Sequence, residues 1–464
     1  MAADVLIIGA GVVGCATARR FALEGAEVIL VEKGADILSG ASKANSAILH
    51  TAFDAPTGSL EQQCMQAGYA EYMEIRDRFN LALVETGAMV VAWTEQEQAS
   101  LDAIEAQARD NGVHDVSRLD AGEILAREPN LSPHAREALL VPREHVIDPW
   151  SPFLAYMIQA QALGATFHFQ TEVSGGSFDG ELWTIKTNRG QLTARTIINC
   201  AGLFGDHVEE QLLGDAHFSI HPRKGQFVVF DKSASTVLKT IILPVPTERT
   251  KGVVLCQTAF GNLLVGPTAE EQDDRLRATT EQETLRDLLA KASAMVPALA
   301  EIPVTATYAG LRPASDKKHY RIRTEADRNW ITLGGIRSTG LTASLGLARH
   351  ALSLYREMQN GGQNLTAIVD PPVIPVRNLA ENRPRDWSKS GNGGIVCHCE
   401  LVTAREIEEA LNGPLPAGDY GGLRRRTRCG MGRCQGFNCQ AHVAAISGNR
   451  LRIPIAPLVP GDRT

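Results

Sequence analysis

"DVLIIGAGVVG", residues 4–14, opens the chain with an apolar run that ends in three closely spaced glycines. The run predicts a buried β-strand, and the residues that follow predict a helix. Gly9 allows a tight turn, Gly11 lets the backbone approach a pyrophosphate, and Gly14 lets the helix and the strand pack closely. A second strand, "AEVILVE", ends at Glu32, an acid placed to bond a ribose hydroxyl and to disfavour a 2′-phosphate. This strand–turn–helix–strand unit predicts a dinucleotide-binding site.

The 464-residue chain is 44% hydrophobic and 21% charged, with a formal net charge of −7. This composition is typical of a globular protein, and the length predicts two or more structural units. The mildly acidic balance gives no reason to expect nucleic acid as a partner. No segment predicts a transmembrane helix, and the N-terminus has no signal-peptide pattern. We therefore expect a cytoplasmic protein, in which clustered cysteines more often bind metal than form disulfides.

Residues 1–370 alternate short apolar runs with helical patterns, which predicts an α/β fold. The expected strands are "VLIIGA", "EVILVE", "MVVAW", "TIINCAG", "QFVVFD", "NLLVGP" and "WITLGG", and the expected helices cover 12–24, 60–79, 281–296 and 340–359. Residues 371–394 are rich in Pro, Asn, Ser and Gly, which predicts a linker draped over the first unit. Residues 395–455 predict a small cysteine-bearing unit, and 456–464 a tail.

The glycine turn alone does not distinguish NAD from FAD. Two later segments do: "TIINCAGLFGD" (196–206) is an apolar strand that ends in Ala-Gly, and residues 330–355 combine a strand, a Gly-rich turn and a long helix. The free N–H groups at the start of that helix could face a pyrophosphate or a flavin ring. Three separated segments that converge on one cofactor favour a large dinucleotide such as FAD.

Residues 1–370 resemble the D-amino-acid-oxidase-type flavoprotein superfamily, which includes glycerol-3-phosphate and L-2-hydroxyglutarate dehydrogenases. The motifs that carry the resemblance are the glycine turn with Glu32, "SKANSAILH" (42–50), "NCAGLFGD" (199–206), "PRKGQF" (222–227), "LVGPT" (264–268), "AGLRP" (309–313) and "GIRSTGLT" (335–342). The resemblance implies a discontinuous, Rossmann-like FAD-binding domain interleaved with an antiparallel-sheet substrate domain. The residues that it implies for FAD binding are Gly9, Gly11, Gly14, Glu32, Ser42, Asn45, Ala201, Gly202, Gly335, Gly340, Leu341 and Thr342.

Members of this superfamily move a hydride from a C–H next to an OH or NH group to the flavin, which requires a cation for the substrate and a base. By resemblance, Arg312 in "YAGLRPAS" is the substrate-anion arginine, because a planar guanidinium matches a carboxylate or a phosphate. The alternative is a surface salt bridge. Arg337 in "GGIRSTG" could hold the substrate or a cofactor phosphate. Tyr308 and Lys224 are weaker candidates, and we expect Lys224 to be solvated.

His50 ends "NSAILH", which resembles the Asn-Ser-Gly-x-x-His stretch that lies beside the flavin in glycerol-3-phosphate and hydroxyglutarate dehydrogenases. Imidazole titrates near neutrality and can act as the base, although a single histidine is more often structural. The sequence departs from the pattern at Ala47, where the family has glycine, and at Thr51-Ala52, where the family step ends in glycine. These departures predict a differently shaped segment. His145 is expected to be structural.

Five cysteines lie near the end of the chain: Cys397, Cys399, Cys429, Cys434 and Cys439. A C-x-C pair is followed, after 34 residues, by a C-x4-C pair, and Cys429 is extra. Zinc sites prefer C-x2-C turns, whereas a [2Fe–2S] cluster takes two thiolates on each iron and suits two separated pairs. Glycines in the second motif free backbone N–H groups to bond cluster sulfur. The four remaining cysteines, Cys15, Cys64, Cys200 and Cys256, are expected in the core.

The stretches "CHCELVT" and "TRCGMGRCQGFNC" resemble the bacterioferritin-associated-ferredoxin-like [2Fe–2S] domain, which is found at the C-terminus of one of the subunits of anaerobic glycerol-3-phosphate dehydrogenases and of opine-oxidase-like proteins. The resemblance implies a [2Fe–2S] cluster and makes Cys429 a substitution. The implied ligands are Cys397, Cys399, Cys434 and Cys439. The alternatives are zinc and a mixed centre that uses His398 or His442. Between the pairs, "VTAREIEEALNG" predicts a short helix with a capping box.

Arginines surround the second cysteine pair at positions 424, 425, 426, 428 and 433. One interpretation is charge balance for a negatively charged cluster together with a solvated face. The other is a docking patch for an acidic redox partner.

Together these features predict an FAD- and [2Fe–2S]-containing dehydrogenase that oxidises a CH–OH group of a small anionic substrate, with glycerol 3-phosphate as the leading guess. Electrons would leave through the cluster to a partner protein or a quinone. A peripheral position at the inner membrane, through a partner, stays open. The alternatives are an L-2-hydroxy acid such as 2-hydroxyglutarate, an opine or secondary amine, or a non-catalytic electron-transfer subunit.

Overall fold

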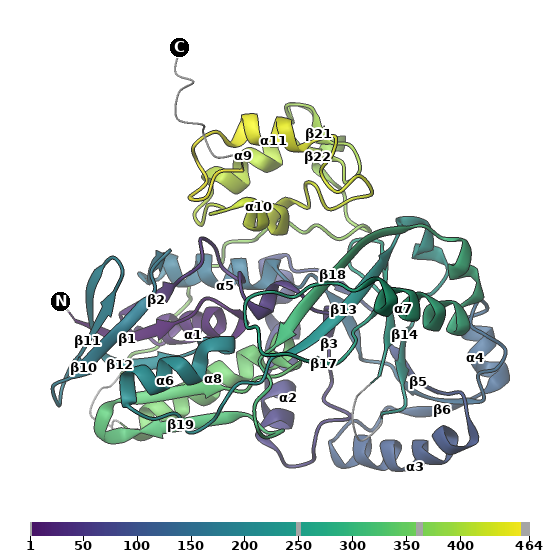
Figure 1. Ribbon diagram of the computed structural model, residues 1–464, viewed down its shortest axis with the longest axis horizontal. Helices are drawn as coiled ribbons and strands as arrows, with labels where there is room; N and C mark the ends of the chain where they lie inside the picture. The colour runs from purple at the N-terminus through teal and green to yellow at the C-terminus, as the bar shows by residue number, and fades with distance from the viewer. Residues whose placement is uncertain (1, 247–251, 359–364, 456–464) are drawn as a thin grey trace.

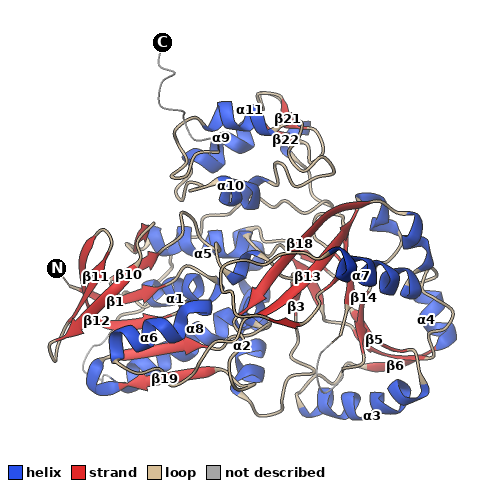
Figure 2. Ribbon diagram, in the orientation of Figure 1, coloured by secondary structure: helices blue, strands red, loops and turns tan. Residues whose placement is uncertain are grey.

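A computed structural model describes residues 2–246, 252–358 and 365–455 of the chain (Figure 1). The predicted tail, 456–464, lies outside the described residues. Figures 1 and 2 show a larger body that contains two sheets, with the small C-terminal unit, yellow in Figure 1, resting on one side of it. The helix of that unit that faces the larger body is α10 (Tyr420–Thr427).

The first sheet has eight strands and a parallel centre. Strand β1 lies between β12 and β2, with Val5 opposite both Thr196 and Val28. The parallel strands are β1 (Ala3–Ile8), β2 (Val28–Glu32), β9 (Thr166–Phe169), β12 (Gly190–Asn199) and β20 (Trp330–Gly334). The antiparallel strands are β10 (Val173–Phe178), β11 (Trp183–Thr187) and β19 (Arg321–Glu325). This is the predicted Rossmann-like sheet.

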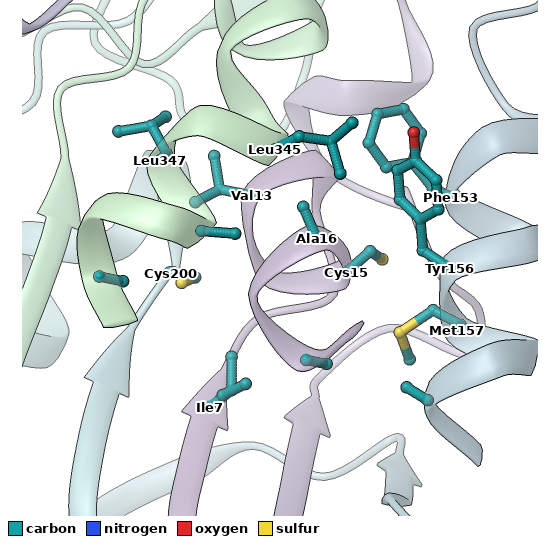
Figure 3. Packing of buried hydrophobic residues seen from close by; sticks show 14 of the residues in the cluster. Ile7, Val13, Cys15, Ala16, Phe153, Tyr156, Met157, Cys200, Leu345 and Leu347 are labelled. Atoms are coloured by element: carbon teal, nitrogen blue, oxygen red, sulfur yellow. The ribbon is translucent and has the colours of Figure 1, made fainter. Parts of the chain in front are cut away.

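Helix α1 packs in the centre of the first core. Figure 3 shows Val13 and Ala16 of α1 between leucines of α8 on one side and Phe153 of α5 on the other, with Ile7 of β1 below. The helices of this half of the molecule are α1 (Val12–Leu23), α2 (Leu60–Phe79), α5 (Ser151–Ala162), α6 (Gly205–Leu213) and α8 (Gly340–Met358). The predicted helices over 12–24, 60–79 and 340–359 are therefore confirmed, to within one residue at their ends.

The second sheet is largely antiparallel and confirms the expected substrate-domain architecture. Strand β18 lies at the edge of the sheet and pairs with β13 along its whole length, which brings Arg223 opposite Arg312. The strands are β5 (Ala88–Ala92), β6 (Ser117–Asp120), β7 (Glu137–Val141), β13 (Arg223–Phe230), β14 (Ile241–Pro244), β15 (Val254–Gln257), β16 (Leu263–Gly266), β17 (Glu270–Glu271) and β18 (Val304–Arg312). Three helices accompany it: α3 (Glu95–Asp110), α4 (Ala121–Arg127) and α7 (Gln282–Met295).

A small three-stranded sheet supports the segment that carries His50. Strand β3 (Ile48–Leu49) pairs antiparallel with β8 (His145–Ile147), which also pairs with β4 (Leu83–Val84).

The segment after residue 365 runs across the first body before it reaches the C-terminal unit. The amide of Ile368 bonds the carbonyl of Leu23 at the end of α1 (2.8 Å), and the amide of Glu381 bonds the carbonyl of Ala259 (2.9 Å). These contacts fit the predicted draped linker, whose limits at 371 and 394 stay a prediction. The C-terminal unit contains β21 (Ile395–Cys397), β22 (Val402–Thr403), α9 (Ala404–Asn412), α10 and α11 (Gln440–Ser447).

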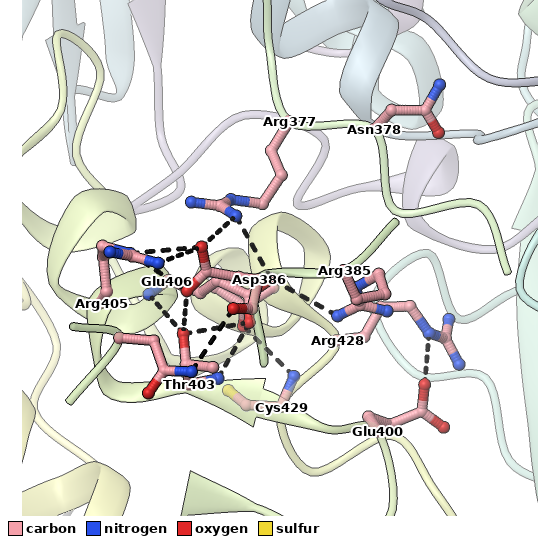
Figure 4. A network of polar contacts seen from close by, with 12 residues as sticks. Arg377, Asn378, Arg385, Asp386, Glu400, Thr403, Arg405, Glu406, Arg428 and Cys429 are labelled. Atoms are coloured by element: carbon pink, nitrogen blue, oxygen red, sulfur yellow. Dashed lines mark hydrogen bonds and ion pairs between the residues drawn. The ribbon is translucent and has the colours of Figure 1, made fainter. Parts of the chain in front are cut away.

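Asp386 fastens the linker to the start of α9 (Figure 4). Its carboxylate accepts hydrogen bonds from the Thr403 hydroxyl (2.6 Å) and the Arg405 guanidinium (2.8 Å). Burial raises the pKa of a carboxyl group, but the hydrogen bonds from Arg405 and Thr403 outweigh it and lower the pKa of Asp386 to about 2. Thr403 and Glu406 form the predicted capping box. Among the described residues, no helix is long and apolar enough to cross a membrane.

Two glycines allow α2 and α8 to touch backbone to backbone. A Cβ at Gly346 of α8 would lie 2.1 Å from the carbonyl oxygen of Cys64 in α2. Gly346→Ala should destabilise the fold by about 1 kcal/mol, because a typical overpacking cost of about 2 kcal/mol exceeds the gain of about 1 kcal/mol in helix propensity. Thermal unfolding monitored by circular dichroism measures the change. Gly40→Ala, where a Cβ meets no atom within 4 Å, is the matched control, and equal melting temperatures for the two variants would contradict the prediction.

Candidate functional site

The first turn after β1 accepts only glycine at two positions. Gly9 has φ +105°, and a Cβ at Gly14 would lie 1.9 Å from the carbonyl oxygen of Gly9. Helix α1 begins without an acid in its first turn, and the Val12 amide there donates to Ser42 Oγ (3.1 Å). The N-terminus of α1 is therefore suited to receive an anion.

Glu32 holds this turn from the end of β2. Its two carboxylate oxygens accept the backbone amides of Ala10 and Gly34, each at 2.7 Å. Burial raises the pKa of Glu32, against the lowering effect of these hydrogen bonds. The carboxylate thus stabilises the glycine turn, and its contact with a ribose hydroxyl stays a prediction.

A cavity of about 990 Å³, counted together with its open mouth, lies where the sequence motifs converge. Its walls come from the α1 turn, residues 41–46, the end of β12, strand β18 and the turn before α8. The predicted residues that line it are Gly11, Ser42, Asn45, Gly202, Arg312, Gly335, Arg337, Gly340 and Leu341. The predicted residues that do not line it are Gly9, Gly14, Glu32, His50, Ala201 and Thr342.

The donors around this cavity fit a dinucleotide such as FAD. The first residues of both α1 and α8 line it, so two helix N-termini point at one volume. Gly340 starts α8, and a Cβ there would lie 3.2 Å from Ile336.

Arg312 brings a guanidinium into the same cavity without a matching carboxylate among the described residues. Its Nη2 donates to the carbonyl oxygen of Thr268 (3.1 Å), whereas its buried Nη1 has no hydrogen-bond partner in the described part of the chain. Burial, and then the charges of Arg223 and Arg337, lower the pKa of Arg312 to about 10. An anion in the cavity would relieve this repulsion. Arg337 is half-buried and donates to the Lys318 carbonyl (3.3 Å). Because a carbonyl carries no net charge, this bond does not neutralise the positive charge of Arg337.

His50 contacts a buried carboxylate that the sequence did not point to. Its Nδ1 lies 2.7 Å from Glu144 Oε2, and its amide donates to Thr342 Oγ1 (3.1 Å). Glu144 is fully buried, and its other oxygen accepts the amide (2.6 Å) and the hydroxyl (2.7 Å) of Thr51. The imidazole is thus oriented through Nδ1, while a quarter of the side chain stays exposed. The β3–β8 pairing creates this contact, and only a prediction of that pairing could have found Glu144.

At both departures from the family pattern near His50, an alanine adopts a left-handed backbone conformation. Ala47 has φ +62° and Ala52 has φ +68°, both in the left-handed region that glycine adopts most easily. The expectation of a differently shaped segment stays a prediction. Each alanine holds a conformation that costs roughly 1–2 kcal/mol, and the contacts on both sides of Glu144 maintain it.

The two weaker candidates, Lys224 and Tyr308, use their polar groups to bond to other residues of the protein. Lys224 is only 7% exposed and forms ion pairs with Glu281 (2.5 Å) and Glu270 (3.0 Å), so the expectation of a solvated lysine is wrong. Burial lowers its pKa, but the hydrogen bonds to these two carboxylates outweigh burial, and the net shift is upward. Tyr308 donates its hydroxyl to the Asn45 carbonyl (2.8 Å) behind the cavity wall. His145 is buried, as expected, and stacks on a tyrosine ring.

The four predicted cluster ligands meet as two pairs that each combine both motifs. Cys439 shares a side-chain hydrogen bond with Cys397, and Cys434 shares one with Cys399. Cys397 Sγ also accepts the amide of Gly430 (3.5 Å). Among the described residues, no three His, Cys, Asp or Glu side chains form a group that could hold a single metal ion. Two thiol pairs with a backbone donor fit the ligand set of a two-iron cluster.

The second cysteine motif wraps the first closely because it is rich in glycine. A Cβ at Gly432 would lie 2.5 Å from Cys399 Cβ, and one at Gly430 would lie 2.2 Å from the Tyr420 hydroxyl. Cys429 is completely buried beside this loop, and burial raises its pKa to about 11. His398 and His442, the alternative ligands, are both exposed.

Several of the arginines around the second pair bond to residues of the first unit. Arg426 forms a buried ion pair with Asp36 of the first unit (2.7 Å), and Arg425 donates to the Ile37 carbonyl (2.9 Å). A Cβ at Gly422 would lie 1.6 Å from Asp36 Oδ2, so α10 rests directly on this segment. Arg433 pairs with Asp231 at the end of β13 (2.9 Å).

Arg428 completes the contact between the two units. It pairs with Glu400 (2.8 Å) and covers the ring of Phe260 at 4.0 Å from its centroid. The cluster-side arginines thus dock the cysteine unit on the first unit. The expectation of a solvated face is wrong for Arg425, Arg426 and Arg428, which are 9% exposed or less in residue or side chain. Because these three arginines are buried and bonded within the chain, they do not form the docking patch of the alternative interpretation.

Comparison with known proteins agrees with this geometry. A family model described as FAD dependent oxidoreductase matches residues 4–354. The chain belongs to this family. A second model, described as a BFD-like [2Fe-2S] binding domain, matches residues 395–446 of the oxidoreductase. Its cofactors are accordingly FAD, in the first unit, and a [2Fe–2S] cluster, in the second.

Relatives of this oxidoreductase are named for glycerol 3-phosphate. It is 29% identical to a glycerol 3-phosphate dehydrogenase of Caloramator mitchellensis, over 98% of this chain and 96% of that protein. It is 25% identical to one of the subunits of the anaerobic glycerol-3-phosphate dehydrogenase of Escherichia coli K12, over 96% of this chain and 87% of that protein. The FAD-bound, dithionite-reduced L-α-glycerophosphate oxidase of Mycoplasma pneumoniae superposes with a TM-score of 0.73 at 27% identity, over 80% of this chain and 97% of that one.

The cysteine pairing predicts which thiols the cluster requires. Cys434→Ser should abolish bound iron and labile sulfide while flavin content is unchanged, because the flavin cavity shares no residue with the cysteine motifs. Iron and sulfide assays and the visible spectrum measure this. Cys429→Ser is the matched control and should keep the cluster. Loss of iron in both variants, or in neither, would contradict the proposed ligand set.

Proposed function

We propose that this oxidoreductase oxidises the CH–OH group of a small phosphorylated alcohol, with glycerol 3-phosphate as the leading substrate, and that the electrons leave through the [2Fe–2S] cluster. The observation that carries the proposal is the Arg312 guanidinium, which lines the cavity and whose buried Nη1 has no hydrogen-bond partner among the described residues. A buried donor of this kind is costly to leave unsatisfied, so it marks the position of an anion.

The charge at the cavity favours a phosphate. Arg312 and Arg337 both line it, and neither forms an ion pair within the described residues. A phosphate carries up to two negative charges and three acceptor oxygens, which suits two guanidinium groups. The names of the relatives point to the same substrate. A 2-hydroxy acid or an opine also offers an anion to Arg312, and these compounds are the competing substrates in the test below.

We assign the hydroxyl proton to His50, although His50 is not among the residues that line the cavity. Glu144 fixes the ring through Nδ1, so we assign the proton to the other ring nitrogen, Nε2. The buried carboxylate also stabilises the imidazolium that forms when the proton arrives. FAD, when bound, supplies the hydride acceptor; the protein supplies the grip on the anion, the orientation of the C–H bond and the base.

The cysteine unit favours a dehydrogenase over an oxidase. The Mycoplasma pneumoniae oxidase structure matches over almost its entire length yet covers only 80% of this chain, whereas the two dehydrogenases cover 96–98% of it. The extra segment is thus shared with dehydrogenases. An enzyme that reduces oxygen directly has no need of a separate one-electron carrier, whereas transfer to a protein or a quinone does use one.

Anaerobic mixing of the purified holoenzyme with candidate substrates tests the proposal. Glycerol 3-phosphate should bleach the flavin absorbance faster and at lower concentration than L-2-hydroxyglutarate, octopine or glycerol, and a dye acceptor should restore it. Faster bleaching by the hydroxy acid or the opine would replace the proposed substrate. Absence of bleaching by every compound would favour the non-catalytic electron-transfer subunit.

Arg312→Met should raise the KM for glycerol 3-phosphate by roughly 10- to 100-fold, the effect of losing a charge-assisted hydrogen-bonded contact of about 1.5–3 kcal/mol. Steady-state kinetics with a dye acceptor measure it. Arg223→Met is the matched control, since Arg223 lies opposite Arg312 in the sheet but pairs with Glu271. An unchanged KM in Arg312→Met, or an equal rise in the control, would remove Arg312 from the substrate site.

A further inference from the structure

A continuous set of contacts joins the wall of the flavin cavity to the cysteine loop. Residues 41, 42 and 44–46 line the cavity, and the carbonyl of Lys43, in their midst, accepts the indole N–H of Trp150 (3.2 Å). The Trp150 ring stacks on Phe260, with centroids 5.6 Å apart and an interplanar angle of 13°. Phe260 also contacts the Arg428 guanidinium, 4.0 Å from the ring centroid.

From Arg428 the contacts continue to a predicted cluster ligand. Cys429 and Gly430 follow Arg428 in the chain, and the Gly430 amide donates to Cys397 Sγ (3.5 Å). Arg428 also bonds Glu400 (2.8 Å), the residue next to Cys399. The chain of contacts thus ends at both members of the C-x-C motif.

Each member of this chain is held in place from outside it. The amide of Trp150 donates to Asp148, a fully buried carboxylate (2.9 Å). Phe260 is 4% exposed and lies in a turn whose carbonyl at Ala259 accepts the linker amide of Glu381 (2.9 Å). Arg428 is 5% exposed. Where the two units meet, the buried Phe260 and Arg428 and the half-buried Trp150 therefore form a contact that includes two aromatic rings.

We propose that the Trp150–Phe260 stack, capped by Arg428, is the electronic contact between the flavin cavity and the [2Fe–2S] unit. Closely stacked aromatic rings and a cation over a ring provide van der Waals contact where through-space gaps would otherwise separate the two cofactor sites. The inference rests on the proposed function, in that the reaction delivers electrons to the cavity, but it concerns residues that touch neither the substrate nor the cysteine ligands.

The electron balance requires such a contact to be used twice in each turnover. Oxidation of one CH–OH group releases two electrons and two protons, and a [2Fe–2S] cluster accepts one electron at a time. Two one-electron transfers therefore pass from the flavin site to the cluster, and two molecules of a one-electron acceptor, for example ferricenium, remove them. The two protons are released to water. No bond in Trp150, Phe260 or Arg428 is made or broken.

The test uses the holoenzyme and starts without substrate. Illumination with EDTA under anaerobic conditions reduces the bound flavin, and the subsequent reduction of the cluster is recorded from its visible bands and its electron paramagnetic resonance signal. Phe260→Leu should slow this step by about tenfold, equivalent to about 1.4 kcal/mol. Phe260→Tyr, which keeps the ring, should retain the wild-type rate. Because light replaces substrate, failure of the proposed substrate would leave this result unaffected.

Controls separate the aromatic contact from simple loosening of the interface. Arg433→Gln removes a neighbouring ion pair between the two units without touching the stack, and it should leave the transfer rate unchanged. Trp150→Leu provides a second loss of stacking if Phe260→Leu does not fold, with Trp150→Phe as its ring-retaining partner. Iron content, flavin content and melting temperature verify each variant. An unchanged rate in both leucine variants, or an equal slowing in Arg433→Gln, would overturn the inference.

Discussion

The contact between Gly14 and the carbonyl of Gly9 is the constraint around which the first unit is built. No side chain fits between them, since a Cβ would lie 1.9 Å from the carbonyl oxygen. Helix α1 can therefore start directly above β1 with its amides exposed, and Glu32 locks the turn by accepting the amides of Ala10 and Gly34. The segment that contains Ser42, strand β18 and the turn before α8 then close around that exposed helix end. Binding of an anionic cofactor thus follows from the backbone geometry before any charged side chain is considered.

Two kinds of hydrogen-bond donor line the cavity. The first kind is the backbone N–H groups at helix N-termini. The second is the guanidinium groups of two arginines that have no carboxylate partner among the described residues. Fixed dipoles and buried cations of this kind cost little to reorganise when a ligand arrives, which is how a preorganised site gains selectivity for an anion. The His50–Glu144 pair repeats this principle on a smaller scale: the buried carboxylate fixes the ring, and two alanines hold left-handed backbone conformations so that the segment can reach it.

Local patterns predicted the elements of this fold well, and they failed where a residue's partner lies far away in the sequence. The spacing of apolar residues identified α2 to the residue, and the cysteine spacing identified the second unit. Lys224 was expected in solvent because no neighbouring residue in the sequence indicates its bond to Glu281, which lies 57 residues later. Glu144 escaped notice because only strand pairing brings it to His50, 94 residues away. The sequence suggested that the arginines near the cluster form a solvated face or a docking patch. Instead, Arg425, Arg426 and Arg433 each have a partner of their own across the interface.

The interface between the two units has a thermodynamic consequence that follows from their being one chain. The linker, residues 371–394, is itself bonded to both units and keeps the cysteine unit at an effective concentration of roughly millimolar. An interface with an intrinsic dissociation constant near 1 mM, or about −4.1 kcal/mol, would therefore already be half closed. The buried pair of Arg426 with Asp36 and the bonds of Arg428 need to exceed that modest threshold by only a little. If electrons pass between the units as proposed, their transfer is a first-order event, whose rate is independent of the protein concentration.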